Sequence, residues 1–135
     1  PDERWNSTLA EVLPLADVFM PNEQELRHIS GRRTMDEAVG WVLAQGVSVV
    51  TVKMGEHGAR AYDRHGMHEC RVEPVTGGDS VGAGDSFDAG FLAGWLRDLP
   101  LARCLEIACR CGRGVASKIG GVAGQPTWRE VTGEA

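Results

Sequence analysis

The sequence predicts an α/β protein with a mostly parallel sheet flanked by helices and one β-hairpin. Helical and strand patterns alternate along most of the chain, and residues 47–52 form a β-branched run typical of a strand buried on both faces. A glycine-rich turn then opens directly into a helix at about residue 83. Ligands bind at the carboxyl ends of strands in open α/β sheets, so motifs that follow strands or begin helices are the candidates for function.

The first elements are short. Residues 6–13 favour a helix capped by Asn6 or Ser7, and residues 16–20 favour a strand that stops at Pro21. Two longer helices then share one start signal, because a polar cap is followed three residues later by a glutamate, as in a capping box. The caps and their glutamates are Asn22 with Glu25 and Thr34 with Glu37, and Gly31 and Gly46 end the two helices.

The second half begins with a hairpin, residues 59–63 and 67–72, that turns around residues 64–66. Two helices follow, over about 83–96 and 101–117, and Asp98-Leu99-Pro100 breaks the chain between them. A last short helix is expected from Pro126-Thr127-Trp128. No repeat or linker divides the chain, so residues 1–135 are expected to form one domain.

Composition excludes several classes of protein. The formal net charge is −5 and no basic run occurs, which argues against nucleic-acid and anionic-membrane partners. No apolar run approaches the ~18 residues of a membrane-spanning helix, and no signal peptide is evident. The four cysteines lack disulfide or zinc spacing and are expected to be reduced, packed thiols of a cytoplasmic protein.

The segment Asp79–Leu92 carries the most information. The first amides of a helix are unpaired and lie at the positive end of its dipole, and small residues let a phosphate approach them. Asp85 stands just inside this helix, where a carboxylate can take a proton from a hydroxyl that attacks the phosphate. A dinucleotide fingerprint would need glycine at Phe87, and no Gly-Lys-Ser/Thr tripeptide of a Walker A loop occurs.

The same segment resembles the C-terminal signature of the ribokinase-like (PfkB-type) carbohydrate kinases. Three further segments, in the family's order, are similar to its Pro-Asn-Glu-x-Glu strand end, its glycine turn beside the nucleotide and its closing loop: residues 17–25, 52–59 and 120–127. The resemblance implies a three-layer α/β sandwich and ATP-dependent phosphorylation of a sugar or similar alcohol. Family members are about twice as long, so the chain corresponds to their C-terminal, phosphate-handling half.

The resemblance assigns roles to particular residues. Asp85 is the expected general base, and the amides of Gly82, Ala83, Gly84 and Asp85 are the expected anion hole. Glu25 is expected to reach Mg²⁺ through water. The expected nucleotide-contacting residues are Asn22, Lys53, Gly55, Glu56, His57, Gly58 and Cys109. Asp79 and Val81 match positions that hold a monovalent cation, such as K⁺, in some relatives.

Each role has a structural alternative. Asp85 in a first helical turn also favours the helix dipole, and Asn22 with Glu25 also forms an ordinary capping box. Lys53 could be the solvated end of a strand and Cys109 a packed thiol. Arg110 and Arg113 are read as surface residues, with Glu106 and Arg110 as an i, i+4 pair.

Three functional alternatives remain open from the sequence. The chain could be a sugar kinase, a nucleotide-binding remnant or subunit without its own catalysis, or a B-vitamin or nucleoside kinase of the same superfamily. The residues that would choose the acceptor are not among those that match. An uncovered sheet edge predicts either a homo-oligomer or a missing N-terminal half as partner.

Overall fold

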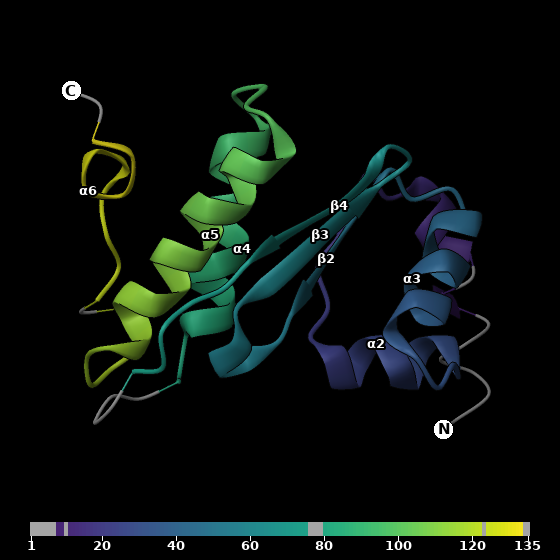
Figure 1. The fold of residues 1–135 in the computed structure, drawn as a ribbon, viewed down its shortest axis with the longest axis horizontal. Coiled ribbons are helices and arrows are strands. Elements are labelled where there is room, and N and C mark those ends of the chain that lie inside the picture. The colour runs from purple at the N-terminus through teal and green to yellow at the C-terminus, as the bar shows by residue number, and fades with distance from the viewer. Residues whose placement is uncertain (1–7, 10, 76–79, 123, 134–135) are drawn as a thin grey trace. The chain divides into compact units, whose positions relative to one another are not determined.

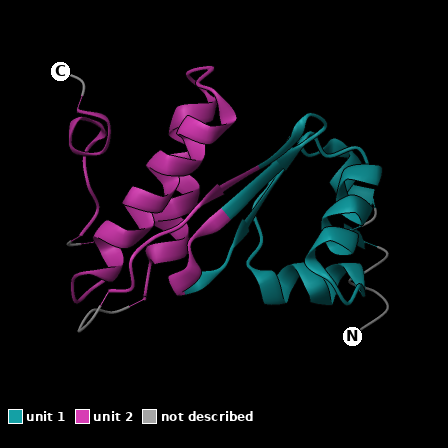
Figure 2. Cartoon of the chain, in the orientation of Figure 1, with its two compact units in different colours: residues 1–55, 60–67 teal, residues 56–59, 68–135 magenta. Residues whose placement is uncertain are grey.

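A computed structural model describes residues 8–9, 11–75, 80–122 and 124–133. The chain divides into two compact units (Figure 2). Unit 1 comprises residues 1–55 and 60–67, and unit 2 comprises residues 56–59 and 68–135. The expectation of one domain stays a prediction.

The described strands form one sheet of order β1-β2-β3-β4 (Figure 1). β1 (Val18–Phe19) runs parallel to β2 (Val49–Lys53). β3 (Ala59–Asp63) and β4 (Gly66–Cys70) are joined by two residues and therefore form an antiparallel hairpin. The α/β class is confirmed, and the sheet within this chain is mixed.

The strand boundaries differ from the sequence expectation. Only two of residues 16–20 are strand, the run at 47–52 moves to 49–53, and the second hairpin strand moves to 66–70. Hydrogen-bonded pairing of β1 with β2 explains the shifted boundaries of these two strands. The amide of Lys53 donates to the Pro21 carbonyl at 3.0 Å, which extends the β2 ladder beyond the β-branched run.

Unit 1 contains α2 (Glu23–Ser30) and α3 (Met35–Ala44), and both predicted capping boxes are present. Gly31 ends α2 in the left-handed conformation, at φ 66°. Of the helix expected at 6–13, residues 8–9 and 11–12 are helical, and a 3₁₀ turn, η1 (Leu13–Leu15), follows. The proposed caps Asn6 and Ser7 lie outside the described residues.

The core of unit 1 joins its helices to β2. Four consecutive residues of β2, 49–52, are buried, which confirms a strand covered on both faces. Burying each large aliphatic side chain contributes about 1.5–3 kcal/mol. The cluster comprises Leu13, Leu26, Ala38, Val39, Val42, Val47, Val50, Val52 and Tyr62.

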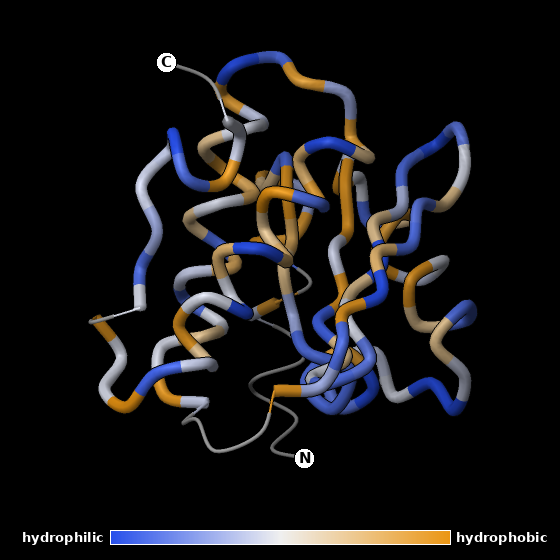
Figure 3. The backbone as a smooth tube through the Cα atoms, turned by 60° about the vertical axis from the view of Figure 1, so that its left-hand side comes forward, coloured by the Kyte–Doolittle hydropathy of each residue, from blue (hydrophilic) through white to orange (hydrophobic). Residues whose placement is uncertain are grey.

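Unit 2 is built on α4 (Ala83–Trp95) and α5 (Leu101–Ala116), with α6 (Trp128–Thr132) near the end. Around these helices hydrophobic and hydrophilic residues alternate (Figure 3). The two long helices pack closely because glycines stand at their contact. A Cβ at Gly90 would lie 2.7 Å from the Cys111 sulfur, and one at Gly94 would lie 3.1 Å from the Cys104 sulfur.

The polar face of α5 holds α6 in place. Arg110 donates to the Val131 carbonyl at 2.7 Å, and Arg103 donates to the Thr132 carbonyl at 3.4 Å. The predicted pair of Glu106 with Arg110 is therefore wrong, because Glu106 bonds Arg103 at 2.9 Å and Arg110 is engaged by α6. Arg113 pairs with Glu73 and is exposed, as expected of a surface residue.

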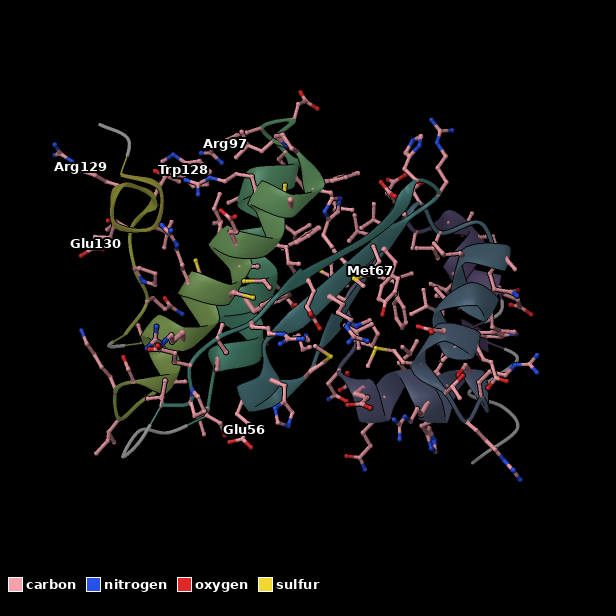
Figure 4. All side chains as sticks on the ribbon, in the orientation of Figure 1. Glu56, Met67, Arg97, Trp128, Arg129 and Glu130 are labelled. Carbon is pink, nitrogen blue, oxygen red and sulfur yellow. The ribbon has the colours of Figure 1, made fainter. Side chains whose placement is uncertain are left out.

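A cation–π contact joins the segment just after α4 to the first residue of α6. The guanidinium of Arg97 lies 4.2 Å from the ring centre of Trp128 (Figure 4). Thr127 caps α6 in a third capping box, with Glu130. Among the described residues, no helix is long and apolar enough to cross a membrane.

Candidate active site

The turn before α4 has a conformation that requires glycine. Gly82, the N-cap of α4, has φ 76°, in the left-handed region that other residues avoid. A Cβ at Gly82 would also lie 2.9 Å from the carbonyl oxygen of Gly121, in the closing loop. The closing loop therefore supports the signature turn directly, a packing relationship that the sequence motifs did not reveal.

The amides at the start of α4 are only partly engaged. The Ala83 amide donates to the Ser80 carbonyl at 3.2 Å, and the Ser86 amide donates to the Gly82 carbonyl at 3.0 Å. Gly82 has no side chain to cap the helix. Among the described residues, the amides of Gly84 and Asp85 make no hydrogen bond. Of the expected anion hole, these two amides are the most accessible to an anion.

The carboxylate of Asp85 faces open space. Asp85 is exposed, and within the described part of the chain it makes no hydrogen bond or ion pair. It borders a pocket of about 310 Å³, whose wall also includes Ala89 and Ala93 of α4 and Arg97 just after that helix. An unengaged carboxylate beside free helix N-terminal amides is the arrangement that the sequence required for a general base.

Ser86, on the next position of α4, escaped the sequence reasoning. It is 5% exposed and lines the same pocket, and its hydroxyl has no hydrogen-bond partner among the described residues. A buried hydroxyl without a partner carries a desolvation cost. The only sequence signal was a polar residue at a position of α4 next to the buried Phe87.

In unit 1 the structure brings Asn22, Glu25 and Lys53 together. Asn22 and Lys53 form a parallel β-bridge at the carboxyl ends of β1 and β2. The Asn22 amide donates to Glu25 Oε2 and the Glu25 amide donates to Asn22 Oδ1, each at 2.8 Å. Because one carboxylate oxygen of Glu25 takes this bond, the second remains for solvent or for a hydrated cation.

Asn22 and Glu25 also border a pocket of about 750 Å³ in unit 1. The wall beside them is largely apolar and includes Phe19, Met20 and Ile29. Such a hollow suits an apolar neighbour better than a phosphate, so only its polar rim is assigned to the candidate site.

The glycine turn expected to contact nucleotide forms a 3₁₀ helix, η2 (Gly55–His57). Glu56 and His57 are exposed, and the Glu56 side chain is labelled in Figure 4. Gly58 is buried at φ 92°, and a Cβ there would lie 2.0 Å from the Cys70 carbonyl oxygen. Only glycine fits this position, because both its backbone angle and its contact exclude a side chain.

Cys109 is 6% exposed, and its sulfur lies 4.0 Å from the Cys70 carbonyl oxygen. Burial, with the neighbouring Cys70, raises the pKa of the Cys109 thiol far above its usual range. Burial likewise raises the pKa of Cys104 and of Cys111. All four cysteines are free, as expected, and burial disfavours the thiolate form of Cys104, Cys109 and Cys111.

Few metal ligands converge in the described residues. They include no group of three or more His, Cys, Asp or Glu side chains that could hold a metal. Val81 is 63% exposed, and Asp79 lies outside the described residues. The monovalent-cation site stays a prediction.

Comparison with known proteins identifies relatives along most of the chain. A family model described as "pfkB family carbohydrate kinase" matches residues 1–128. The chain is 31% identical to a cytidine kinase of Thermococcus kodakarensis over 83% of this chain and 41% of that protein. It is 33% identical to a fructoselysine 6-kinase of Escherichia coli over 81% of this chain and 40% of that protein.

Solved structures agree. A putative ribokinase II from Escherichia coli in its apo form matches with a TM-score of 0.87 and 30% identity, over 96% of this chain and 42% of that one. The ATP and Mg²⁺ complex of a putative ribokinase II from the same organism matches with a TM-score of 0.86 and 31% identity, over 93% and 41%. The chain thus spans about two fifths of the relatives it matches. With its ribokinase fold and these matches, the chain belongs to the PfkB family of carbohydrate kinases.

Proposed function

We propose that this chain supplies the phosphate-handling part of an ATP-dependent kinase that phosphorylates a hydroxyl group of a sugar or sugar-like substrate. The exposed, unpaired Asp85 beside the open amides of α4 is the observation that carries the proposal. Family membership supports it, because the relatives named above are kinases.

In the proposed reaction the acceptor hydroxyl oxygen attacks the terminal phosphorus of ATP. Asp85 takes the hydroxyl proton as the new O–P bond forms, and the bond from that phosphorus to the bridging oxygen breaks to release ADP. A positioned base of this kind contributes about 10²–10⁴ in rate. The amides of Gly84 and Asp85, with those of Gly82 and Ala83, would hold the phosphoryl oxygens as charge builds on them.

Residues of unit 1 and of the turn would hold the nucleotide and its metal. The free oxygen of Glu25 suits a water-mediated contact with Mg²⁺, which retains most of its water shell and neutralises phosphate charge when bound. Lys53, at the end of β2, supplies a positive charge for the phosphates. Gly55, Glu56, His57 and Gly58 would line the nucleotide. Asn22 would orient water or phosphate beside Glu25.

A nucleotide-binding subunit without its own catalysis is the second candidate. It is favoured by the span of this chain, about two fifths of its relatives, since residues for the acceptor would come from elsewhere. The relatives act on acceptors as different as fructoselysine and cytidine, so the acceptor belongs to the proposal only as an alcohol.

The test combines binding with turnover. Titration with ATP and Mg²⁺ is followed by ADP release in the presence of ribose, fructose or cytidine. Asp85→Asn is expected to retain nucleotide binding and to lower turnover by about 10²-fold or more. Asp98→Asn, in the turn between α4 and α5, is the matched control and should leave turnover unchanged.

Three outcomes distinguish the kinase from the nucleotide-binding subunit and test the proposed site. Turnover that depends on Asp85 supports the kinase. Binding of ATP by the chain without turnover on any acceptor supports the nucleotide-binding subunit instead. Full activity in Asp85→Asn, or no binding of ATP at all, rejects the proposed site.

A further inference from the structure

Unit 2 contains two cysteines that lie close together beside the glycine turn. Cys70 ends β4 and is half-buried, whereas Cys109, on α5, is buried. The Cys109 sulfur lies 4.0 Å from the carbonyl oxygen of Cys70. The Cys70 thiol itself donates to the Arg71 carbonyl at 4.0 Å, and its presence contributes to the raised pKa of the Cys109 thiol. The Cys109 thiol therefore lies beside the backbone of Cys70, 39 positions earlier in the chain.

The carbonyl of Cys70 also supports the turn. A Cβ at Gly58 would lie 2.0 Å from this oxygen and 3.0 Å from Arg71 Cα, so the Gly58 backbone rests directly on residues 70 and 71. Gly58 has no side chain that could yield. Any movement of the Cys70 backbone is therefore transmitted to the segment Glu56–Ala59, which belongs to the same unit.

We propose that Cys70 and Cys109 are a redox-responsive thiol pair, and that closing a disulfide between them displaces the Glu56–Ala59 segment. The two remaining cysteines do not share this arrangement. The Cys104 thiol donates to the Leu99 carbonyl at 3.4 Å, and Cys111 packs against Gly90. Of the four cysteines, Cys70 and Cys109 are therefore the two whose contacts suit a disulfide.

The chemistry requires an oxidant of the disulfide class, such as oxidised glutathione. The more accessible Cys70 attacks one sulfur of that disulfide, which forms a mixed disulfide and releases one glutathione thiolate. Cys109 then loses its proton and attacks the Cys70 sulfur, which releases the second glutathione. Overall two protein thiols are oxidised to one disulfide, and one glutathione disulfide is reduced to two thiols. Burial keeps the Cys109 thiol protonated, so this second step is the slower one.

The first experiment detects the bond itself and is independent of any activity. The reduced protein is incubated with oxidised glutathione, quenched in acid and digested without reductant. We expect a peptide pair linked through Cys70 and Cys109, the loss of two of the four titratable thiols, and recovery of both with dithiothreitol. Cys70→Ser should abolish the linked pair, and Cys104→Ser, whose hydroxyl can keep the bond to Leu99, should retain it.

The second experiment detects the displacement. Amide hydrogen exchange of residues 56–59 is compared between the oxidised and reduced protein, and we expect faster exchange in the oxidised form. The Cys70→Ser variant should show no difference between the two conditions. Wild-type protein that retains glutathione on Cys70 without a linked pair, or a linked pair that leaves exchange at 56–59 unchanged, overturns the proposal.

A consequence for nucleotide rests on the proposed function. If residues 56–58 contact ATP, oxidation should weaken ATP binding by about fivefold or more. A disulfide with altered exchange but no ATP binding in either form would reject the nucleotide role of the turn and leave the thiol pair in place. The two failures are thus distinguishable.

Discussion

Asn22 and Lys53 stand opposite each other across a parallel β-bridge, with the Lys53 amide bonded to the Pro21 carbonyl at 3.0 Å. The pairing places Asn22, the N-cap of α2, beside Lys53, the last residue of β2. Both residues lie at the carboxyl ends of parallel strands, where open α/β sheets bind ligands. A capping residue and a strand-end lysine thereby become parts of one candidate site.

Substitution of two helix caps in unit 1 can distinguish the structural role of Asn22 from its proposed functional role. Asn22 and Thr34 each form a complete capping box, but only Asn22 adjoins Lys53. Asn22→Ala and Thr34→Ala should each lower the free energy of unfolding by about 1 kcal/mol, measured by urea denaturation. Only Asn22→Ala should also weaken ATP binding in calorimetric titration. Equal ATP affinity in the two variants would reduce Asn22 to a cap.

A side chain at Gly82 should damage the signature turn. Gly82→Ala forces a left-handed backbone on alanine and brings its Cβ to 2.9 Å from the Gly121 carbonyl. The expected loss of stability is about 1–3 kcal/mol, with loss of phosphate binding at α4. The control is Gly40→Ala, in the exposed middle of α3 with no atom within 4 Å of the new Cβ, which should stabilise by about 0.5–1 kcal/mol. A stable Gly82→Ala protein with unchanged ATP binding would contradict the packing argument.

Removal of the buried Thr51 hydroxyl should stabilise the protein. Thr51 is fully buried in β2, and its hydroxyl has no partner among the described residues. Thr51→Val keeps the shape, removes the unsatisfied group and should raise the free energy of unfolding by about 1 kcal/mol. In Thr132→Val the same change deletes a 2.8 Å bond to the Trp128 carbonyl and should destabilise. Destabilisation by Thr51→Val would contradict the claim that this hydroxyl is unsatisfied.

Stability should fall in acid through the capping glutamates. Hydrogen bonds from the Thr34 side chain and backbone hold the pKa of Glu37 below its ordinary value of 4.5. A carboxyl whose pKa is lowered by folding stabilises the protein above its unfolded pKa, and this contribution is lost as the pH falls through its folded pKa. Glu37→Gln keeps an oxygen for the cap but cannot titrate.

Unfolding midpoints of wild type and Glu37→Gln, compared between about pH 6 and pH 3, measure this contribution. The wild type should lose more stability than the variant as the pH falls below 4.5. Parallel curves would show that Glu37 contributes nothing to the acid sensitivity.

Much of the local structure was predictable because its causes are local. The polar caps with a glutamate three residues later, the left-handed Gly31 and the hairpin around residues 64–66 depend on bonds within a few residues. The glycine-rich signature likewise specified where α4 begins. Errors arose where a distant partner decides the outcome: β1 is shorter and β2 ends later because strand length depends on pairing, and Arg110 bonds α6 instead of Glu106.

The amino-acid order alone thus determined the family, the helix starts and the candidate base Asp85, because a motif and a cap are written in neighbouring residues. Only the tertiary structure placed Gly121 against Gly82, Lys53 beside Asn22, and Cys70 against both Gly58 and Cys109. Those contacts join residues far apart along the chain. They arise from burial and sheet pairing, which no short stretch of sequence encodes.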